Sequence, residues 1–174
     1  MNADNPQTGA AQWAAARAGD AAAIAALVRE HQRMVYSLGL RILRNRAAAE
    51  DLTQDVFMQF CQKLATLDGA AHARHWLRQV ATHRAIDQLR RRPPIATSDD
   101  VLSLVDETEA GDPLLANRLR ALIGDLPAHA RAVVVLRYQE DMDPTEIGEL
   151  LDMPLNTVKS HLRRALEVLR AHLT

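Results

Sequence analysis

Polar side chains near the carboxyl end of the chain are spaced to share one face of a helix from Leu155 to about Ala171. They are Thr157, Ser160, His161 and Arg164. Hydroxyl, imidazole and guanidinium groups can hydrogen-bond to base edges in the major groove of DNA. The cations beside this stripe, Lys159, Arg163 and Arg170, suit phosphate oxygens, which supply affinity but little sequence information. These residue types in this pattern favour recognition of duplex DNA.

The residues just before this helix predict how it is positioned. Asp143 has a capping side chain, Pro144 suits the first helical position and Glu146 suits the third, so a short helix begins there and ends near Leu151. Residues 152–154 form the turn. The apolar residues of the last helix recur at three- and four-residue steps and should be buried: Val158, Leu162, Ala165, Leu166 and Leu169. A short helix, a tight turn and a longer helix with polar N-terminal residues is the helix-turn-helix arrangement.

For the last helix alone, the alternative is an amphipathic surface helix with a solvated basic face. The capped helix and turn before it disfavour that interpretation. The net charge of −1 argues at first against a nucleic-acid-binding protein, but this average hides a strong segregation of charge along the chain. Residues 72–92 carry six arginines against one acid, residues 93–112 carry six acids and no lysine or arginine, and residues 155–174 carry four bases against one acid. Two basic segments separated by an acidic one favour binding to nucleic acid.

Apolar periodicity predicts an all-α fold with two small helical domains, at residues 20–92 and 113–174. In the first we expect one long helix or two end to end, with Asn45 as a C-terminal cap, and then helices at 47–67 and 73–92. The third of these should bury Trp76, Leu77, Val80, Ala81, Ile86 and Leu89. The second domain should hold four helices, with Tyr138 near the core side of the second. Residues 1–19 are expected to form a tail and residues 93–112 a flexible acidic linker.

Several function classes find no support in the sequence. Cys61 is the single cysteine, and no Cys/His spacing resembles a zinc site. We find no nucleophile–base set, metal-ligand cluster or phosphate-binding glycine loop, so we expect no catalysis, cofactor or metal. No apolar run is long enough to span a bilayer, and the first residues do not look like a secretion signal. We therefore expect a cytoplasmic protein without membrane insertion.

Four segments together resemble the extracytoplasmic-function group of bacterial RNA polymerase sigma factors. DPTEIGELLDMPLNTVKSHLRRALEVLR at 143–170 is similar to the −35 reader of region 4, and LPAHARAVVVLRYQED at 126–141 to the helix before it. AEDLTQDVF at 49–57 resembles the polymerase-binding segment of region 2. WLRQVATHRAIDQLRRR at 76–92 resembles the helix that engages the −10 element. The resemblance covers about Asp20 to Ala171 and implies a region 2 bundle, the linker and a region 4 helix-turn-helix.

The resemblance also implies roles for individual residues. Binding of the −35 element falls to Thr157, Lys159, Ser160, His161, Arg163 and Arg164. Binding of the −10 element falls to His72, Arg74, Arg78, His83, Arg84, Asp87, Arg90 and Arg91, with residues 67–73 as the loop that captures a flipped base. Binding of core polymerase falls to Asp51, Gln54, Asp55 and Gln59.

Three residues depart from the family's pattern. Primary sigma factors melt DNA with several aromatic residues, whereas Trp76 is the only aromatic residue of the predicted −10 helix here. Its apolar spacing favours core packing over DNA melting. His83 stands where the family often has asparagine, which puts base contact there in doubt. His161 stands where arginine is common, which weakens the guanine contact expected at that step.

The implied partners are core RNA polymerase, through the clamp helices and flap of its large subunits, and promoter DNA. An anti-sigma factor is a further partner that the family implies, although no residue identifies one. The alternative function is a two-domain helix-turn-helix regulator that does not bind core polymerase as a sigma factor. The segments at 49–57 and 76–92 disfavour it, because a sensor domain has no need of them. Without a partner, the two DNA-reading surfaces should be loosely coupled through the linker.

Overall fold

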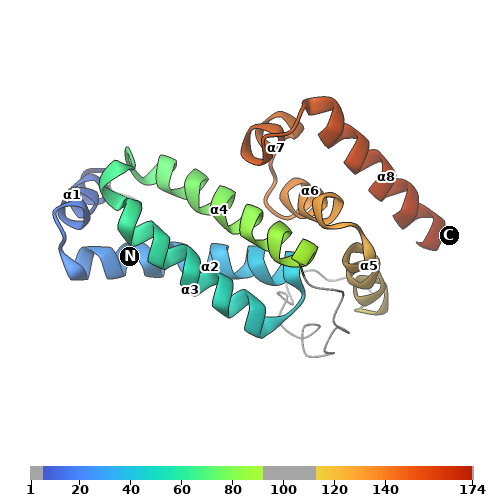
Figure 1. Ribbon diagram of the computed structural model, residues 1–174, viewed down its shortest axis with the longest axis horizontal. Helices are drawn as coiled ribbons and strands as arrows, with labels where there is room; N and C mark the ends of the chain where they lie inside the picture. The colour runs from blue at the N-terminus through green and yellow to red at the C-terminus, as the bar shows by residue number, and fades with distance from the viewer. Residues whose placement is uncertain (1–5, 92–112, 174) are drawn as a thin grey trace.

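The computed structural model describes residues 6–91 and 113–173, and within these ranges the chain is helical and contains no strand. Helices α1 to α4 form one bundle and helices α5 to α8 form a second beside it (Figure 1). The predicted linker, residues 93–112, lies outside the described residues. The all-α, two-bundle architecture expected from the apolar periodicity is confirmed.

The first bundle is built on α2 (Ala21–Leu43), α3 (Arg46–Lys63) and α4 (Ala70–Arg91). The side chain of Asp20 caps α2 by accepting a hydrogen bond from the Ala23 amide at 2.7 Å. The expectation that Asn45 ends this helix is wrong. Arg44 ends it with a left-handed φ of 54°, and Asn45 instead caps the start of α3 by accepting from the Ala48 amide at 2.8 Å.

The core of the first bundle lies where α2, α3 and α4 meet. The ring of Phe60 is fully buried there, edge-on to Phe57 at 6.1 Å between centroids and tilted against Trp76 at 6.2 Å. Leu77, Ala81 and Ile86 are buried as predicted, whereas Trp76, Val80 and Leu89 are half-buried at the edge of the core. The contact of Trp76 with Phe60 supports its predicted role in packing.

Helix α1 (Pro6–Arg17) takes up most of the segment that the sequence predicted to be a tail. Trp13 and Ala16 are buried in the core of the first bundle, and the Arg17 guanidinium donates to the Ala65 carbonyl at 2.8 Å. Ala65 belongs to a short 3-10 helix, η1 (Leu64–Thr66), which follows α3. Sequence reasoning missed α1 because Trp13 is its one large apolar residue and alanine is its commonest one, which marks no apolar face.

His31 is a titratable side chain buried within the first bundle. Its Nε2 has no hydrogen-bond partner among the described residues, and burial, with Arg74 nearby, lowers the pKa of the imidazole below its usual value. Glu30 opposes this shift. The unfolded chain therefore binds a proton here more readily than the folded chain, so stability falls as the pH drops through about 6.5 towards the lower folded pKa.

We expect His31→Gln to flatten this acid loss, because glutamine is neutral throughout and close in size. Urea unfolding at several pH values between about 5 and 7.5 measures the free energy of unfolding of each variant. His75→Gln is the matched control, because His75 is exposed on α4. An unchanged pH slope in His31→Gln would contradict the prediction.

The second bundle comprises α5 (Pro113–Asp125), α6 (Ala128–Tyr138), α7 (Pro144–Leu151) and α8 (Leu155–Leu173). The four helices expected from the sequence are confirmed. Val133, Leu136, Ile147, Leu150 and Val158 are fully buried where α6, α7 and α8 meet. Tyr138 was expected near the core, but it lies at the last turn of α6 with its side chain exposed.

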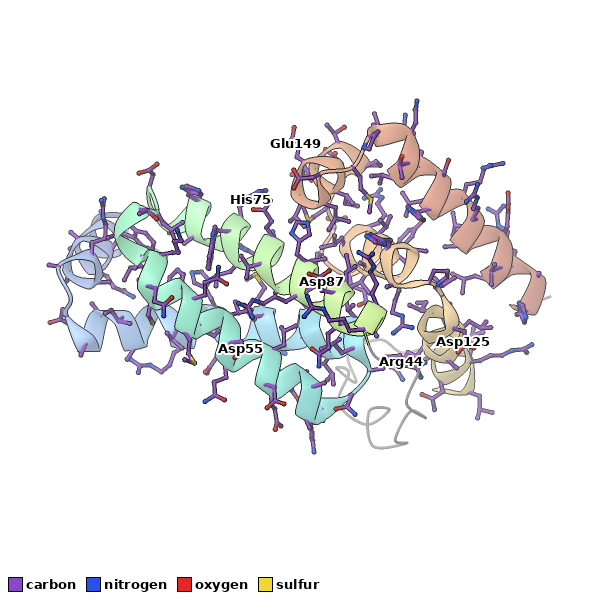
Figure 2. The ribbon with its side chains drawn as sticks, in the orientation of Figure 1. Arg44, Asp55, His75, Asp87, Asp125 and Glu149 are labelled. Carbon is purple, nitrogen blue, oxygen red and sulfur yellow. The ribbon has the colours of Figure 1, made fainter. Side chains whose placement is uncertain are left out.

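The two bundles pack against each other, with α6 against α2 and α4, and α7 against α4 (Figure 1). The Arg131 guanidinium donates to the Ile42 carbonyl at 2.7 Å, and that of Arg44 donates to the Ala121 carbonyl at 3.3 Å. Figure 2 shows Arg44 beside the end of α5, where Asp125 lies. The expected loose coupling is therefore not what the structure shows, because buried apolar residues of both bundles form one continuous core.

Candidate nucleic-acid interface

A capping box fixes the first helix of the helix-turn-helix. The Asp143 carboxylate accepts from the Thr145 amide at 2.7 Å and from the Glu146 amide at 2.9 Å, and the Glu146 carboxylate accepts from the Asp143 amide at 2.7 Å. The two amide hydrogen bonds that Asp143 accepts lower the pKa of its carboxyl group. The predicted cap is confirmed.

The turn between α7 and α8 is held by a close backbone approach at Gly148. Its carbonyl accepts from the Met153 amide at 2.9 Å, after Asp152 ends α7 with a left-handed φ of 52°. A Cβ placed on Gly148 would lie only 2.8 Å from the Met153 carbonyl oxygen. The angle between α7 and α8 therefore depends on glycine at position 148, where there is no room for a side chain.

The polar face of α8 points away from the second bundle. Among the residues predicted to read the −35 element, Lys159, Arg163 and Arg164 are exposed, while Thr157 and Ser160 are partly exposed. Arg163 lies 3.8 Å from Glu167, one turn later on the same helix. The predicted buried stripe holds at Val158, Ala165 and Leu169, with Leu162 and Leu166 half-buried at its edges.

His161 is partly exposed, like its neighbour Ser160, and lies where the polar face of α8 borders the core. Its ring stacks on that of His129 in α6, with 6.4 Å between centroids and 16° between planes. Burial, with His129 and Arg164 nearby, lowers the pKa of His161, so this imidazole favours the neutral form more strongly than an exposed histidine does. The contact with His129 spans helices, so helical spacing within α8 could not reveal it.

Asn156 is a candidate that sequence reasoning missed. It is exposed in the first turn of α8, beside the predicted Lys159 and Ser160. An asparagine amide can pair with adenine through two hydrogen bonds, which no lysine can do. Its position at the start of the second helix of a helix-turn-helix was the available signal, because N-terminal residues of that helix contact bases.

The residues predicted to bind the −10 element lie on α4. His72, Arg74, Asp87, Arg90 and Arg91 are exposed, and His83 is half-buried. The predicted loop at 67–73 is shorter than expected, because α4 begins at Ala70 and places His72 in its first turn. There the His72 Nδ1 accepts from the Asp68 amide at 3.2 Å. Gly69, with a φ of 112°, makes the turn into the helix.

Arg84 joins the predicted DNA-binding set to the predicted polymerase-binding set. Its guanidinium donates to the Gln59 side-chain oxygen at 2.9 Å and to the Asp55 carboxylate at 3.4 Å, crossing from α4 to α3. Figure 2 shows Asp55 on α3 and Asp87 towards the carboxyl end of α4. Both partners of Arg84 were predicted to contact polymerase, so the two surfaces meet along the edge between these helices.

The remaining predicted polymerase residues, Asp51 and Gln54, are exposed on α3. Gln54 borders a groove of about 710 Å³ between α2 and α3. The groove includes the buried ring of Phe57 and the side chain of Met58, which is 60% exposed. An apolar groove with polar side chains at its border is the kind of surface that a partner helix can fill.

Arg78 is the predicted −10 residue that the structure withdraws from the surface. Its Nη2 lies 3.0 Å from a carboxylate oxygen of Glu140, which follows α6 in the second bundle.

The described residues contain no group of three or more histidine, cysteine, aspartate or glutamate side chains that could hold a metal ion. Within the described ranges, no helix is both long and apolar enough to cross a membrane.

Comparison with known families gives two matches in the order of the two bundles. Residues 27–93 match the model of sigma-70 region 2, and residues 116–169 match that of sigma-70 region 4. The chain is 31% identical over 170 residues to the ECF RNA polymerase sigma factor SigW of Bacillus subtilis, covering 89% of this chain and 91% of that protein. It is 32% identical over 168 residues to the ECF sigma factor SigL of Mycobacterium tuberculosis, covering 92% and 94%.

Solved structures share the fold. CnrH in complex with the cytosolic domain of CnrY has a TM-score of 0.66 at 21% identity, covering 95% of this chain and 96% of that one. The sigma factor RpoE of Bartonella quintana in complex with the anti-sigma factor NepR has a TM-score of 0.65 at 18% identity, covering 82% and 91%. The two family matches define the class, a promoter-recognition protein of the sigma-factor type. This chain belongs to the sigma-70 family and, within it, to the extracytoplasmic-function sigma factors.

Proposed function

We propose that this sigma factor reads the −35 element with the outward face of α8 and the −10 element with α4, while α3 docks on core polymerase. The observation that carries this assignment is the exposed face of α8, where Lys159, Arg163 and Arg164 project from a capped helix-turn-helix. Asn156 joins the −35 set. Phosphate contacts by such a face fix the register, and polar contacts to base edges select the sequence.

The polymerase surface comprises Asp51, Gln54, Asp55 and Gln59 together with the α2–α3 groove. Its carboxylates and amides lie beside exposed apolar surface, which is the mixture that protein interfaces use at their borders and centres. The protein supplies recognition and leaves catalysis to the polymerase, so its site of action is the cytoplasm. The complex of the sigma factor RpoE with the anti-sigma factor NepR supports an anti-sigma factor as a further partner.

Transcription of fragmented genomic DNA by core polymerase, with and without this protein, tests the proposal. We expect discrete start sites that depend on the protein, and sequencing of RNA 5′ ends should show shared −10 and −35 sequences upstream. Failure to direct initiation, despite folded protein and active core, would favour the two-domain regulator.

A charge reversal on α3 separates polymerase docking from folding. Asp51→Lys should weaken the complex with core polymerase and reduce transcription, while the helical circular dichroism remains unchanged. Glu30→Lys is the matched control, because Glu30 is exposed on α2 and does not border the groove. If both variants form the complex equally well, the assigned surface is wrong.

Two neighbouring arginines of α8 should have different roles. We expect Arg164→Ala to weaken binding to a −35 duplex by about 1–3 kcal/mol and to relax sequence preference, because it removes a base contact. Arg163→Ala should lower affinity more evenly across sequences, because it removes a phosphate contact. Titration of each variant against specific and scrambled duplexes by fluorescence anisotropy measures both effects. Equal losses on the two duplexes for both variants would contradict this division.

A further inference from the structure

Glu140 lies at the boundary between the two bundles, between two arginines of the first. Its Oε2 is 3.0 Å from Arg78 Nη2 on α4, and its Oε1 is 3.6 Å from Arg41 Nη1 on α2. The carboxylate side chain is only 10% exposed, and those of Arg78 and Arg41 are 19% and 23% exposed. Ion pairs this sheltered from water are screened far less by salt than pairs on an open surface.

The first bundle alone supplies both positive charges of this cluster. Two guanidinium groups from different helices converge on one anion, and the anion comes from the other bundle. Carboxylate and phosphate oxygens present similar acceptor geometry to arginine, so a pair that holds one can hold the other. Arg78 belongs to the basic run of α4, whereas Arg41 lies on α2 outside that run.

We propose that Arg41 and Arg78 form a site for a backbone phosphate of promoter DNA, and that Glu140 occupies this site while the two bundles are packed together. The proposal rests on the proposed function, in which α4 approaches the −10 element. The carboxylate and the phosphate compete for the same two guanidinium groups, so packing of the bundles and full DNA contact by the first bundle exclude each other.

The dimensions of a promoter require the site to be vacated. Elements centred near −35 and −10 are about 25 base pairs apart, or about 85 Å along B-form DNA. A compact chain of this length has a radius of gyration of about 16 Å, so the packed bundles cannot reach both elements at once. When the second bundle moves to the −35 element, Glu140 moves with it, and Arg41 and Arg78 are left without their counter-ion.

Binding of the full-length protein to a fluorescent single-stranded oligonucleotide, followed by anisotropy, tests the site. Glu140→Gln should bind about tenfold more tightly, because the amide no longer neutralises the arginines. The dependence of log affinity on log salt should steepen by about 0.7 for the added phosphate contact. Adding Arg41→Gln to this variant should remove both changes.

Asp141→Asn is the matched control, because it removes the same charge from an adjacent exposed residue. Tightening by Glu140→Gln no greater than that by Asp141→Asn would overturn the proposal, and so would tightening that survives Arg41→Gln. Tighter binding to core polymerase with unchanged DNA affinity would assign the arginine pair to a protein carboxylate instead. These DNA tests could fail while the wild-type protein still directs promoter-specific transcription. That result would contradict the phosphate site and leave the proposed function intact.

A distance measurement on protein with Glu140 intact covers the case in which Glu140→Gln does not fold. Labels on the native Cys61 of α3 and on Ala171→Cys of α8, both exposed positions, report separation of the bundles by energy transfer. Saturating oligonucleotide should lengthen the distance in protein with Arg41 and Arg78 intact, and less so in Arg41→Gln. An unchanged distance in the saturated protein would contradict competition between Glu140 and DNA.

Discussion

Replacing Phe60 with alanine should lower the free energy of unfolding by about 3–5 kcal/mol. The Phe60 ring is fully buried between α2, α3 and α4, and it contacts the rings of Phe57 and Trp76. Alanine would leave a cavity that these rigid helices cannot close, and the aromatic contacts would be lost as well. Because typical domains are stable by only 5–15 kcal/mol, the first bundle should be partly unfolded near physiological temperature.

Urea unfolding followed by circular dichroism and tryptophan fluorescence measures this loss. Met58→Ala is the matched control on the same helix, because the Met58 side chain is 60% exposed and little packing is removed with it. We expect that variant to unfold within about 0.5 kcal/mol of the wild type. A loss below about 1 kcal/mol for Phe60→Ala would show that the core repacks around the gap.

Gly148→Ala should abolish most binding to the −35 element while leaving the first bundle intact. The new Cβ would lie 2.8 Å from the Met153 carbonyl oxygen, so the turn must open and α8 must rotate against α7. Recognition needs side chains placed within about 0.5 Å and 10–20° of their bound geometry. We therefore expect at least a tenfold loss of affinity for a −35 duplex, equivalent to about 1.4 kcal/mol.

Gly9→Ala makes the same chemical change where a Cβ would meet nothing within 4 Å. Because alanine is the better helix former, this control should be neutral or stabilising by up to about 1 kcal/mol. Anisotropy with the −35 duplex and thermal unfolding separate the two effects. Unchanged duplex affinity in Gly148→Ala would mean that the turn tolerates the side chain and that the close approach is not needed for recognition.

The local elements were predictable where local chemistry decides them. The Asp143–Pro144–Glu146 cap and the apolar stripe of α8 each act within a few residues, so their sequence patterns carry the information. Helix α1 was missed because one tryptophan among alanines has no periodicity, although Trp13 is buried. Asn45 was assigned to the wrong helix because two helices meet there, and a cap residue alone does not say which one it serves.

The helices that carry the candidate residues were predictable from the sequence, but the contacts of these residues across helices were not. His161 stacks on His129, and Arg78 binds Glu140 far along the sequence, so neither pairing leaves a periodic trace. Arg41 was overlooked for a similar reason, because its proposed role depends on sharing Glu140 with Arg78 from another helix. Such positions depend on how helices pack, which is a property of the whole fold.

The hydrogen bonds from Arg84 to Asp55 and Gln59 couple the binding of polymerase to the binding of DNA. If Asp55 and Gln59 bind polymerase, the Arg84 guanidinium loses both acceptors and becomes available to a DNA phosphate. The gain is reciprocal, because DNA that captures Arg84 must favour polymerase binding by the same factor. Solvent-exposed pairs of this kind are worth about 0.2–1 kcal/mol, so the cooperativity is limited to roughly fivefold. Such a coupling would favour promoter contact by the holoenzyme over contact by the free subunit.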